Sequence, residues 1–223
     1  MTYLVDNPQV IFETFQNQFL TLTEGEDEGY EMNYWNNPNL TFPPLALPTW
    51  SIFNGNYPKH RGNPIYDTPS KIYNSVGGEL ATLYNSNPAK YQNTCAIRIS
   101  KGINYSQLSI PAGPDRYQGA DGKYYFISAI ALLKWMKLTF GTPTGSNHLT
   151  GSQGGANGKN FPFLLSGKKG IYIMIPNIPG GCNTQTGFCA SGHADMIENG
   201  KCDGSCYFNP TGGVSDIFIW ELP

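Results

Sequence analysis

The sequence contains few charged side chains and no long apolar run. Of its 223 residues, 13% are charged, and 14 lysines and arginines face 16 acidic residues. A nucleic-acid-binding surface needs a concentration of basic side chains that this composition does not supply. No stretch approaches the roughly 18 consecutive apolar residues of a membrane-spanning helix. We therefore expect neither nucleic acid nor a membrane among the partners.

A Sec signal is also missing from the start of the sequence. Residues 1–8 lack the basic start and the apolar run of such a peptide, so we do not expect export by that route. The composition nevertheless resembles that of exported proteins, with 26 glycines, 17 prolines and few charges. A function proposed for the chain has to reconcile these two observations.

Five cysteines are present, and four of them crowd into one region: Cys182, Cys189, Cys202 and Cys206. Their C-x6-C and C-x3-C spacings differ from the C-x2-C pairs typical of zinc sites, so we favour disulfides and keep zinc as the alternative. Two disulfides, in any of three pairings, would leave Cys95 unpaired. Because disulfides persist in oxidising compartments, the cluster predicts a protein that works outside the cytoplasm. We expect no metal or other cofactor.

The apolar pattern predicts helices first and strands later. Helix caps followed by proline occur at Asn7 and Thr68, and a Gly-Thr-Pro sequence ends the helical pattern near residue 140. The expected helices cover residues 8–22, 69–83, 95 onward and 125–140, and the expected strands cover residues 170–175, 192–197, 201–203 and 217–220. This order predicts an α+β fold in which helices pack on one side of an antiparallel sheet.

Cys95 follows the polar pair Asn93 and Thr94, which predicts that it lies in the first turn of a helix. The unpaired N–H groups and positive end of the helix dipole at that position lower the pKa of a thiol and can bind an oxyanion. Cys95 is therefore the candidate nucleophile. The alternative is a buried structural cysteine without chemistry.

A cysteine nucleophile needs a base and a group that orients the base. His193 is the candidate base, and Asp195 and Asp203 lie in the hairpin that contains it. If residues 198–200 form a three-residue turn, the two carboxylates face each other and share the sheet face of His193. Asp195 lies two residues from His193 on the same strand, roughly 6 to 7 Å away, so we favour Asp203 for the orienting role.

Five blocks of sequence, in order, resemble the fourth family of type VI secretion amidase effectors. The block around the cysteine, N-T-C-A-I-R-I-S at residues 93–100, is similar to the family's N-A-C-x-I-R-M-S. The other four are the double glycine at residues 75–78, G-K-K-G-I at residues 167–171, S-G-H at residues 191–193 with its C-x3-C at residues 202–206, and W-E-L-P at residues 220–223.

The resemblance implies a papain-like cysteine peptidase core that cleaves the peptidoglycan stem peptide between D-glutamate and meso-diaminopimelate. It also implies delivery by a type VI secretion apparatus, contact with a component of that apparatus, and a cognate immunity protein in the producing cell. The site of action would be the periplasm of the target cell. Delivery of this kind reconciles the missing Sec signal with the cysteine cluster.

The resemblance covers residues 65–223, which we expect to form the amidase domain, and leaves residues 1–64 as an N-terminal extension without an assigned role. It also implies that the catalytic aspartate lies two residues after the first cysteine of C-x3-C. This chain has Gly204 there, and Asp203 precedes it by one position.

Two other classes of function are compatible with the sequence. Tyrosines, tryptophans and asparagines in glycine-rich loops are typical of a non-catalytic module that binds cell wall or carbohydrate. A disulfide-stapled structural domain would bury Cys95 as an inert thiol. Alkylation of the native protein separates these cases, because a catalytic thiolate reacts fast.

Overall fold

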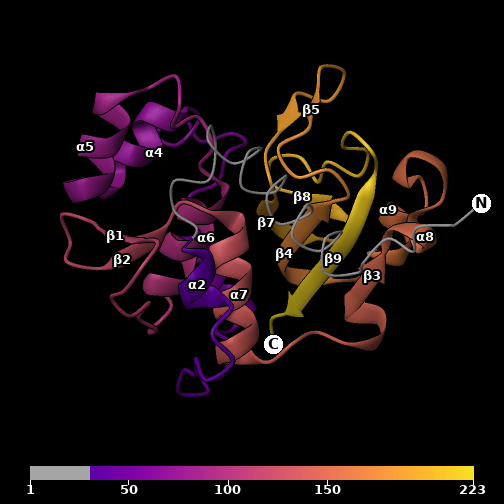
Figure 1. The fold of residues 1–223 in the computed structure, drawn as a ribbon, viewed down its shortest axis with the longest axis horizontal. Helices are drawn as coiled ribbons and strands as arrows, with labels where there is room; N and C mark the ends of the chain where they lie inside the picture. Colours follow the sequence, from indigo (N-terminus) through magenta and orange to yellow (C-terminus); the bar gives the residue numbers. More distant parts are fainter. Residues whose placement is uncertain (1–30) are drawn as a thin grey trace, which may run out of the picture.

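The computed structural model describes residues 31–223. The helix predicted for residues 8–22 lies outside this range. Within it, no helix is both long and apolar enough to cross a membrane. The described part of the chain forms a helical layer beside an antiparallel sheet (Figure 1), so the predicted α+β class is confirmed.

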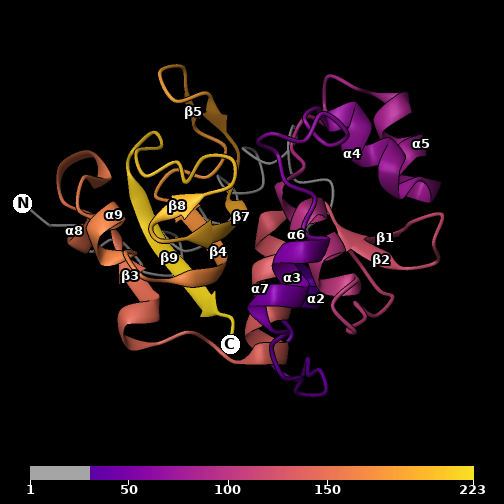
Figure 2. The same ribbon diagram turned by 180° about the vertical axis from the view of Figure 1, so that it is seen from behind.

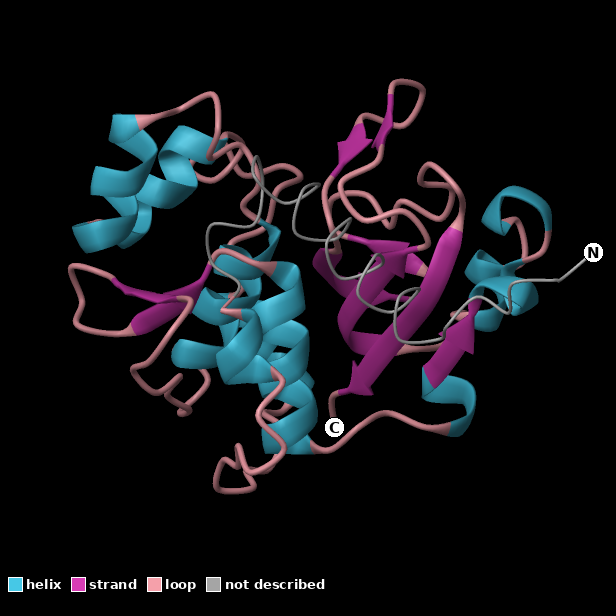
Figure 3. Ribbon diagram, viewed as in Figure 1, coloured by secondary structure: helices cyan, strands magenta, loops and turns pink. Residues whose placement is uncertain are grey.

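The main sheet has the strand order β3-β9-β4-β7-β8, and every neighbouring pair is antiparallel. Its strands are β3 (His148–Thr150), β4 (Lys169–Pro176), β7 (His193–Glu198), β8 (Lys201–Cys202) and β9 (Val214–Glu221). Figure 3 shows this sheet beside the helices that cover it. The central position of β4 explains its continuous apolar sequence, because both of its faces are buried.

Side chains alternate between two cores on the faces of the sheet. Ile171 and Ile173 of β4 face the core that contains the helices α6 (Cys95–Asn104) and α7 (Ala129–Phe140). Tyr172 of the same strand faces the second core, which the short helix α9 (Phe161–Leu164) closes. The view from behind shows α6 and α7 on one side of the sheet and α9 on the other (Figure 2). The nucleophile helix thus packs directly on the sheet.

One predicted helix is divided in two by its glycines. Helix α4 (Pro69–Val76) begins at the predicted cap, where the Thr68 side chain accepts a hydrogen bond from the Lys71 backbone N–H. It ends at Gly77, whose φ of 70° no ordinary helical residue adopts, and α5 (Gly78–Ser86) follows. A Cβ at position 78 would lie 2.5 Å from the carbonyl oxygen of Gln118. Close packing therefore explains the double glycine, but the uninterrupted helix was wrong.

The helix predicted for residues 125–140 starts later than expected. Residues 124–126 form the strand β2 (Tyr124–Phe126), which pairs with β1 (Arg116–Gln118). Helix α7 begins after Ser128, whose side chain accepts a hydrogen bond from the Ala131 backbone N–H. A short buried strand and a buried helical turn have similar apolar patterns, so the pattern alone could not separate them.

Residues 31–64 share the core of the residues that follow them. They contain α2 (Met32–Trp35) and α3 (Trp50–Asn56), and the buried side chains of Trp35 and Phe53 belong to the same cluster as Ile99 of α6. The backbone N–H of Trp50 also donates to the carbonyl of Pro223 at 2.7 Å. The core is therefore continuous across the predicted boundary at residue 64.

Two disulfides and one unpaired thiol are present, as the cysteine spacing predicted. Cys182 pairs with Cys189 and Cys202 pairs with Cys206, which leaves Cys95 free. The first bridge joins β5 (Cys182–Asn183) to β6 (Phe188–Cys189). The remaining short elements are α8 (Gly151–Gly154) and the 3-10 turns η1 (Gly145–Asn147) and η2 (Ala156–Gly158).

Candidate active site

Cys95 is the first residue of α6, as the preceding polar residues predicted. Thr94 occupies the cap position, but its side chain makes no capping hydrogen bond and instead accepts one from Nε of Arg98 at 3.1 Å. The N–H groups of the first turn are therefore left without a side-chain cap. These N–H groups lie at the end of α6 at which the helix dipole is positive.

His193 is the first residue of β7, the strand on which α6 packs, and it contacts Cys95. Burial alone would raise the pKa of the Cys95 thiol. The hydrogen bond and charge of His193, with the backbone N–H groups of Ala194 and Ala96, outweigh burial and lower that pKa. Burial alone would lower the pKa of His193, but the adjacent Asp195 carboxylate and the Cys95 thiolate raise it to about 9. Both shifts favour a thiolate beside an imidazolium.

Asp195 is the carboxylate that faces the imidazole. Its Oδ2 lies 3.6 Å from Nε2 of His193, and its side chain is 4% exposed. Because Nε2 faces the carboxylate, Nδ1 is the ring nitrogen available to the thiol. Three N–H or O–H groups donate to Asp195: the Tyr57 hydroxyl at 2.8 Å, the Gly204 N–H at 2.9 Å and the Met196 N–H at 2.7 Å.

Asp203 lies elsewhere because the predicted strand register was wrong. The hairpin turns through Asn199 and Gly200 alone, with φ values of 51° and 75°, so Ile197 pairs with Cys202. A shift of one residue moves a side chain to the opposite face of a strand. The Asp203 N–H accordingly donates to the Met196 carbonyl, and the Asp203 carboxylate accepts a hydrogen bond from the His60 backbone N–H.

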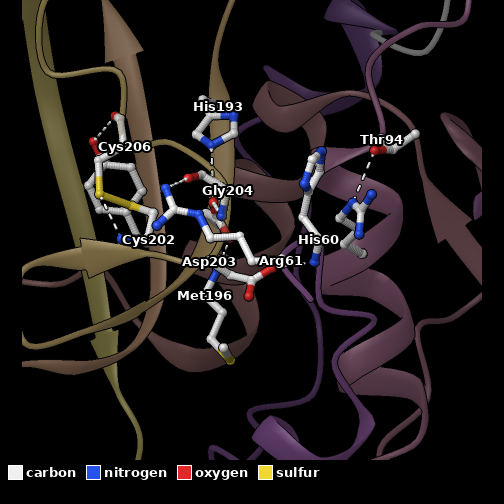
Figure 4. Close-up of polar contacts among 12 residues, drawn as sticks. His60, Arg61, Thr94, His193, Met196, Cys202, Asp203, Gly204 and Cys206 are labelled. Atoms are coloured by element: carbon white, nitrogen blue, oxygen red, sulfur yellow. Dashed lines mark hydrogen bonds and ion pairs between the residues drawn. A yellow bond between two sulfur atoms is a disulfide. The ribbon is translucent and has the colours of Figure 1, made fainter. Parts of the chain in front are cut away.

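Sequence reasoning missed the segment 57–66, which forms one wall of the site. Figure 4 shows His60 between Thr94 on the helical side and Asp203 on the sheet side, with the Arg61 side chain extending toward Gly204. A guanidinium N–H of Arg61 donates to the carbonyl of Gly204 at 2.6 Å. The segment therefore joins the two halves of the site.

Arg98 holds the same segment from the opposite side. It is buried on α6 and donates to the carbonyls of Pro58 at 2.5 Å and Tyr66 at 2.6 Å. The arginine was visible in the block at residues 93–100, but the pattern gave no indication of its two carbonyl partners. No feature of the sequence predicted that Tyr57 would lie at the site.

A cavity of about 470 Å³ opens beside Cys95, His193 and Asp195. The segment 57–66 and the disulfide-closed hairpin β5–β6 contribute to its walls. Residues 31–223 contain no group of three or more histidine, cysteine, aspartate or glutamate side chains that could hold a metal ion. The protein groups that the site brings together are a thiol, an imidazole, a carboxylate and helix N–H donors.

Helices packed on an antiparallel sheet, with a cysteine at a helix start and a histidine on the adjoining strand, define a papain-like fold. The model of one family, type VI secretion system amidase effector protein 4 (Tae4), matches residues 91–220. The chain belongs to this amidase effector family. A comparison with curated proteins gave no match.

Solved structures share the fold. Tae4 from Enterobacter cloacae has a TM-score of 0.58 and 18% identity, covering 82% of this chain and all of its own. The Tae4–Tai4 effector–immunity complex from the same organism gives a TM-score of 0.59 at 18% identity, covering 80% and 100%. The Tae4/Tai4 effector–immunity system from Salmonella typhimurium gives 0.56 at 20% identity, again covering 80% and 100%.

Proposed function

We propose that this amidase effector is a cysteine peptidase that hydrolyses the amide bond between D-glutamate and meso-diaminopimelate in the peptidoglycan stem peptide. The observation that carries the proposal is the contact of Cys95, at the start of α6, with His193, whose Nε2 faces Asp195 at 3.6 Å. In this assignment Cys95 is the nucleophile, His193 the acid and base, and Asp195 the orienting carboxylate. Asp195 replaces Asp203, which the sequence favoured.

The first half of the reaction forms a thioester. The Cys95 thiolate attacks the carbonyl carbon of the glutamate side chain, and the electron pair of the C=O bond moves to oxygen. When the tetrahedral intermediate collapses, the C–N bond breaks and the His193 imidazolium donates its proton to the leaving nitrogen of diaminopimelate. The products are a glutamyl thioester on Cys95 and a free amine.

The second half hydrolyses the thioester. Neutral His193 removes a proton from water, and the hydroxide formed attacks the thioester carbonyl. Collapse of this second intermediate expels the thiolate and leaves the glutamate carboxylic acid, which loses its proton to solvent, while His193 remains as the imidazolium. In both intermediates the oxyanion lies near the uncapped N–H groups of the first turn of α6, which can donate to it.

The charges at the cavity suit the proposed substrate. The D-glutamate residue, linked through its side chain, keeps its α-carboxylate free at the other end of that side chain, and the diaminopimelate residue carries a free amino group. Arg61 lies at the wall of the cavity and Asp67 also lines it. Arg61, which also donates to the Gly204 carbonyl, and Asp67, which also pairs with Lys71 at 2.8 Å, can interact with these two groups. The volume of about 470 Å³ is in the range of sites that enclose a small ligand.

Family membership also indicates where the enzyme acts. We propose that it is delivered by the type VI apparatus, contacts a component of that apparatus, and reaches the periplasm of the target cell. Two disulfides agree with an oxidising destination. A cognate immunity protein would protect the producing cell, in line with the effector–immunity complexes named for the solved relatives.

Digestion of purified sacculi tests the proposal. The wild-type protein should release muropeptides with a new amino terminus on diaminopimelate, identified by mass analysis, and Cys95→Ala should release none. Cleavage at a sugar linkage, or at the amide joining muramic acid to alanine, would contradict the assigned bond. Binding to sacculi without any release by the wild-type protein would instead support the wall-binding module.

A further inference from the structure

We infer that Tyr57 is a positioning residue of the active site: its hydroxyl fixes the Asp195 carboxylate in the orientation from which it faces His193. The expected effect of Tyr57 on turnover rests on the proposed function. Its structural basis is independent of the substrate. Tyr57 lies outside residues 91–220, the part of the chain that matches the family model.

The tyrosine hydroxyl donates to Oδ1 of Asp195 at 2.8 Å, and both side chains are buried. Burial, and then the negative charge of Asp195, raise the pKa of Tyr57 well above its usual value. The phenol therefore remains protonated and neutral at any working pH. A neutral donor can hold the carboxylate without competing with His193 as a second positive charge.

Tyr57 supplies what the other partners of Asp195 cannot. The Met196 N–H belongs to the adjacent residue on β7, and the Gly204 N–H comes from the neighbouring loop, so both lie on the sheet side. Tyr57 follows α3 and donates from the helical layer. Because His193 is 3.6 Å from Oδ2, a small rotation of the carboxylate group would change this separation. The hydroxyl opposes that rotation by holding the other oxygen.

The backbone of Tyr57 is itself held in place. Its N–H donates to the Phe53 carbonyl at 2.8 Å and ends α3. The next carbonyl, that of Pro58, accepts from Arg98 of α6 at 2.5 Å. The helix that begins with Cys95 therefore also fixes the residue that orients Asp195. The nucleophile and the orienting carboxylate are placed by one connected set of contacts.

The test compares Tyr57→Phe with Tyr172→Phe. Both tyrosines are buried, and each hydroxyl makes one hydrogen bond of 2.8 Å, but that of Tyr172 goes to the Cys206 carbonyl. Each variant loses a similar bond, so thermal unfolding should shift by similar amounts. Only Tyr57→Phe should lower kcat, by about tenfold, with KM little changed, and Tyr172→Phe should keep the wild-type kcat.

The decisive measurement is the pH dependence of Cys95 alkylation, which needs no substrate. With a misoriented carboxylate the imidazolium of His193 is less stable and the Cys95 thiol ionises at higher pH, so the pH window of fast alkylation should begin at higher pH in Tyr57→Phe alone. In an Asp195→Asn background, adding Tyr57→Phe should have no further effect on the window. An unchanged window in Tyr57→Phe, or an equal change in Tyr172→Phe, would overturn the inference. Failure of wild-type protein to cut sacculi would overturn the proposed function and leave this measurement valid.

Discussion

The backbone N–H of Gly204 donates to Oδ2 of Asp195 at 2.9 Å, and a Cβ at position 204 would lie only 3.1 Å from that oxygen. The carboxylate of Asp195 therefore occupies the space that a side chain at 204 would enter. Position 204 is where the family resemblance places an aspartate. In this chain Gly204 stands there. The carboxylate that faces His193 is that of Asp195, which lies on the same strand as the histidine.

Asp195→Asn should reduce turnover by several orders of magnitude, because it removes the charge that stabilises the imidazolium of His193. Asp203→Asn should retain most activity, since its carboxylate accepts from the His60 backbone. The measurement is the rate of muropeptide release, with Cys95 alkylation as a second readout. Near wild-type activity in Asp195→Asn would refute the assignment.

The proximity at position 204 allows a rescue experiment. In an Asp195→Ala background, Gly204→Asp should restore part of the lost activity, because the new carboxylate would start from a Cβ next to the vacated space. Gly204→Asp in the wild-type background should instead lower activity, since two carboxylates would then repel each other. A matched Gly204→Asn in the same Asp195→Ala background should restore less.

The pH profile of the enzyme should be wide. The pKa of Cys95 is lowered and that of His193 is raised to about 9, so the reactive pair exists between the two values. We expect kcat/KM to fall as pH rises through about 9, because His193 then no longer carries the proton that the leaving amine needs. The raised pKa of His193 also means that its charge stabilises the fold fully below about 6.5 and that this contribution is lost as pH rises through about 9. In Cys95→Ala, which removes one partner, the loss should begin at lower pH, as unfolding measurements at several pH values would show.

Thiol counting should give one reactive group in the denatured, unreduced protein and five after reduction. Reduction should also lower the free energy of unfolding, by less than the ~2 to 4 kcal/mol of a typical bridge, because both bridges close short loops. Replacing both cysteines of one disulfide at a time with serine would show which bridge contributes more to the free energy of unfolding. Two or more thiols before reduction would contradict the pairing.

Removal of residues 1–64 should prevent folding, because Trp35 and Phe53 lie in the same core as Ile99. Phe53→Ala tests the same point in the full chain and should cost about 3 to 5 kcal/mol of unfolding free energy. Ile65→Ala is a matched control, since that apolar side chain is 64% exposed. A soluble, cooperatively unfolding fragment 65–223 would contradict this expectation and support the predicted boundary at residue 64.

The local parts of the site could be predicted from sequence, and the long-range parts could not. The polar residues before Cys95 predicted its place in the first turn of α6, because the start of a helix depends on neighbours in sequence, although the Thr94 side chain makes no capping hydrogen bond. The predicted register of the hairpin was wrong because Asn199 adopts a positive φ, which makes a two-residue Asn-Gly turn. Tyr57 could not be predicted, since its partner lies 138 residues away and no periodic pattern connects the two.

The hairpin β5–β6 closes on itself through the Cys182–Cys189 bridge, projects beyond the sheet and lines the cavity (Figure 1). Because its closure does not depend on β7, the strand that carries His193, its tip can change in sequence while the reacting groups stay in place. Residues 184–187, all exposed, are thus a natural position for diversification between related toxins. For protein engineering, the same loop is a site at which a library can alter what enters the cleft at little expense to the fold.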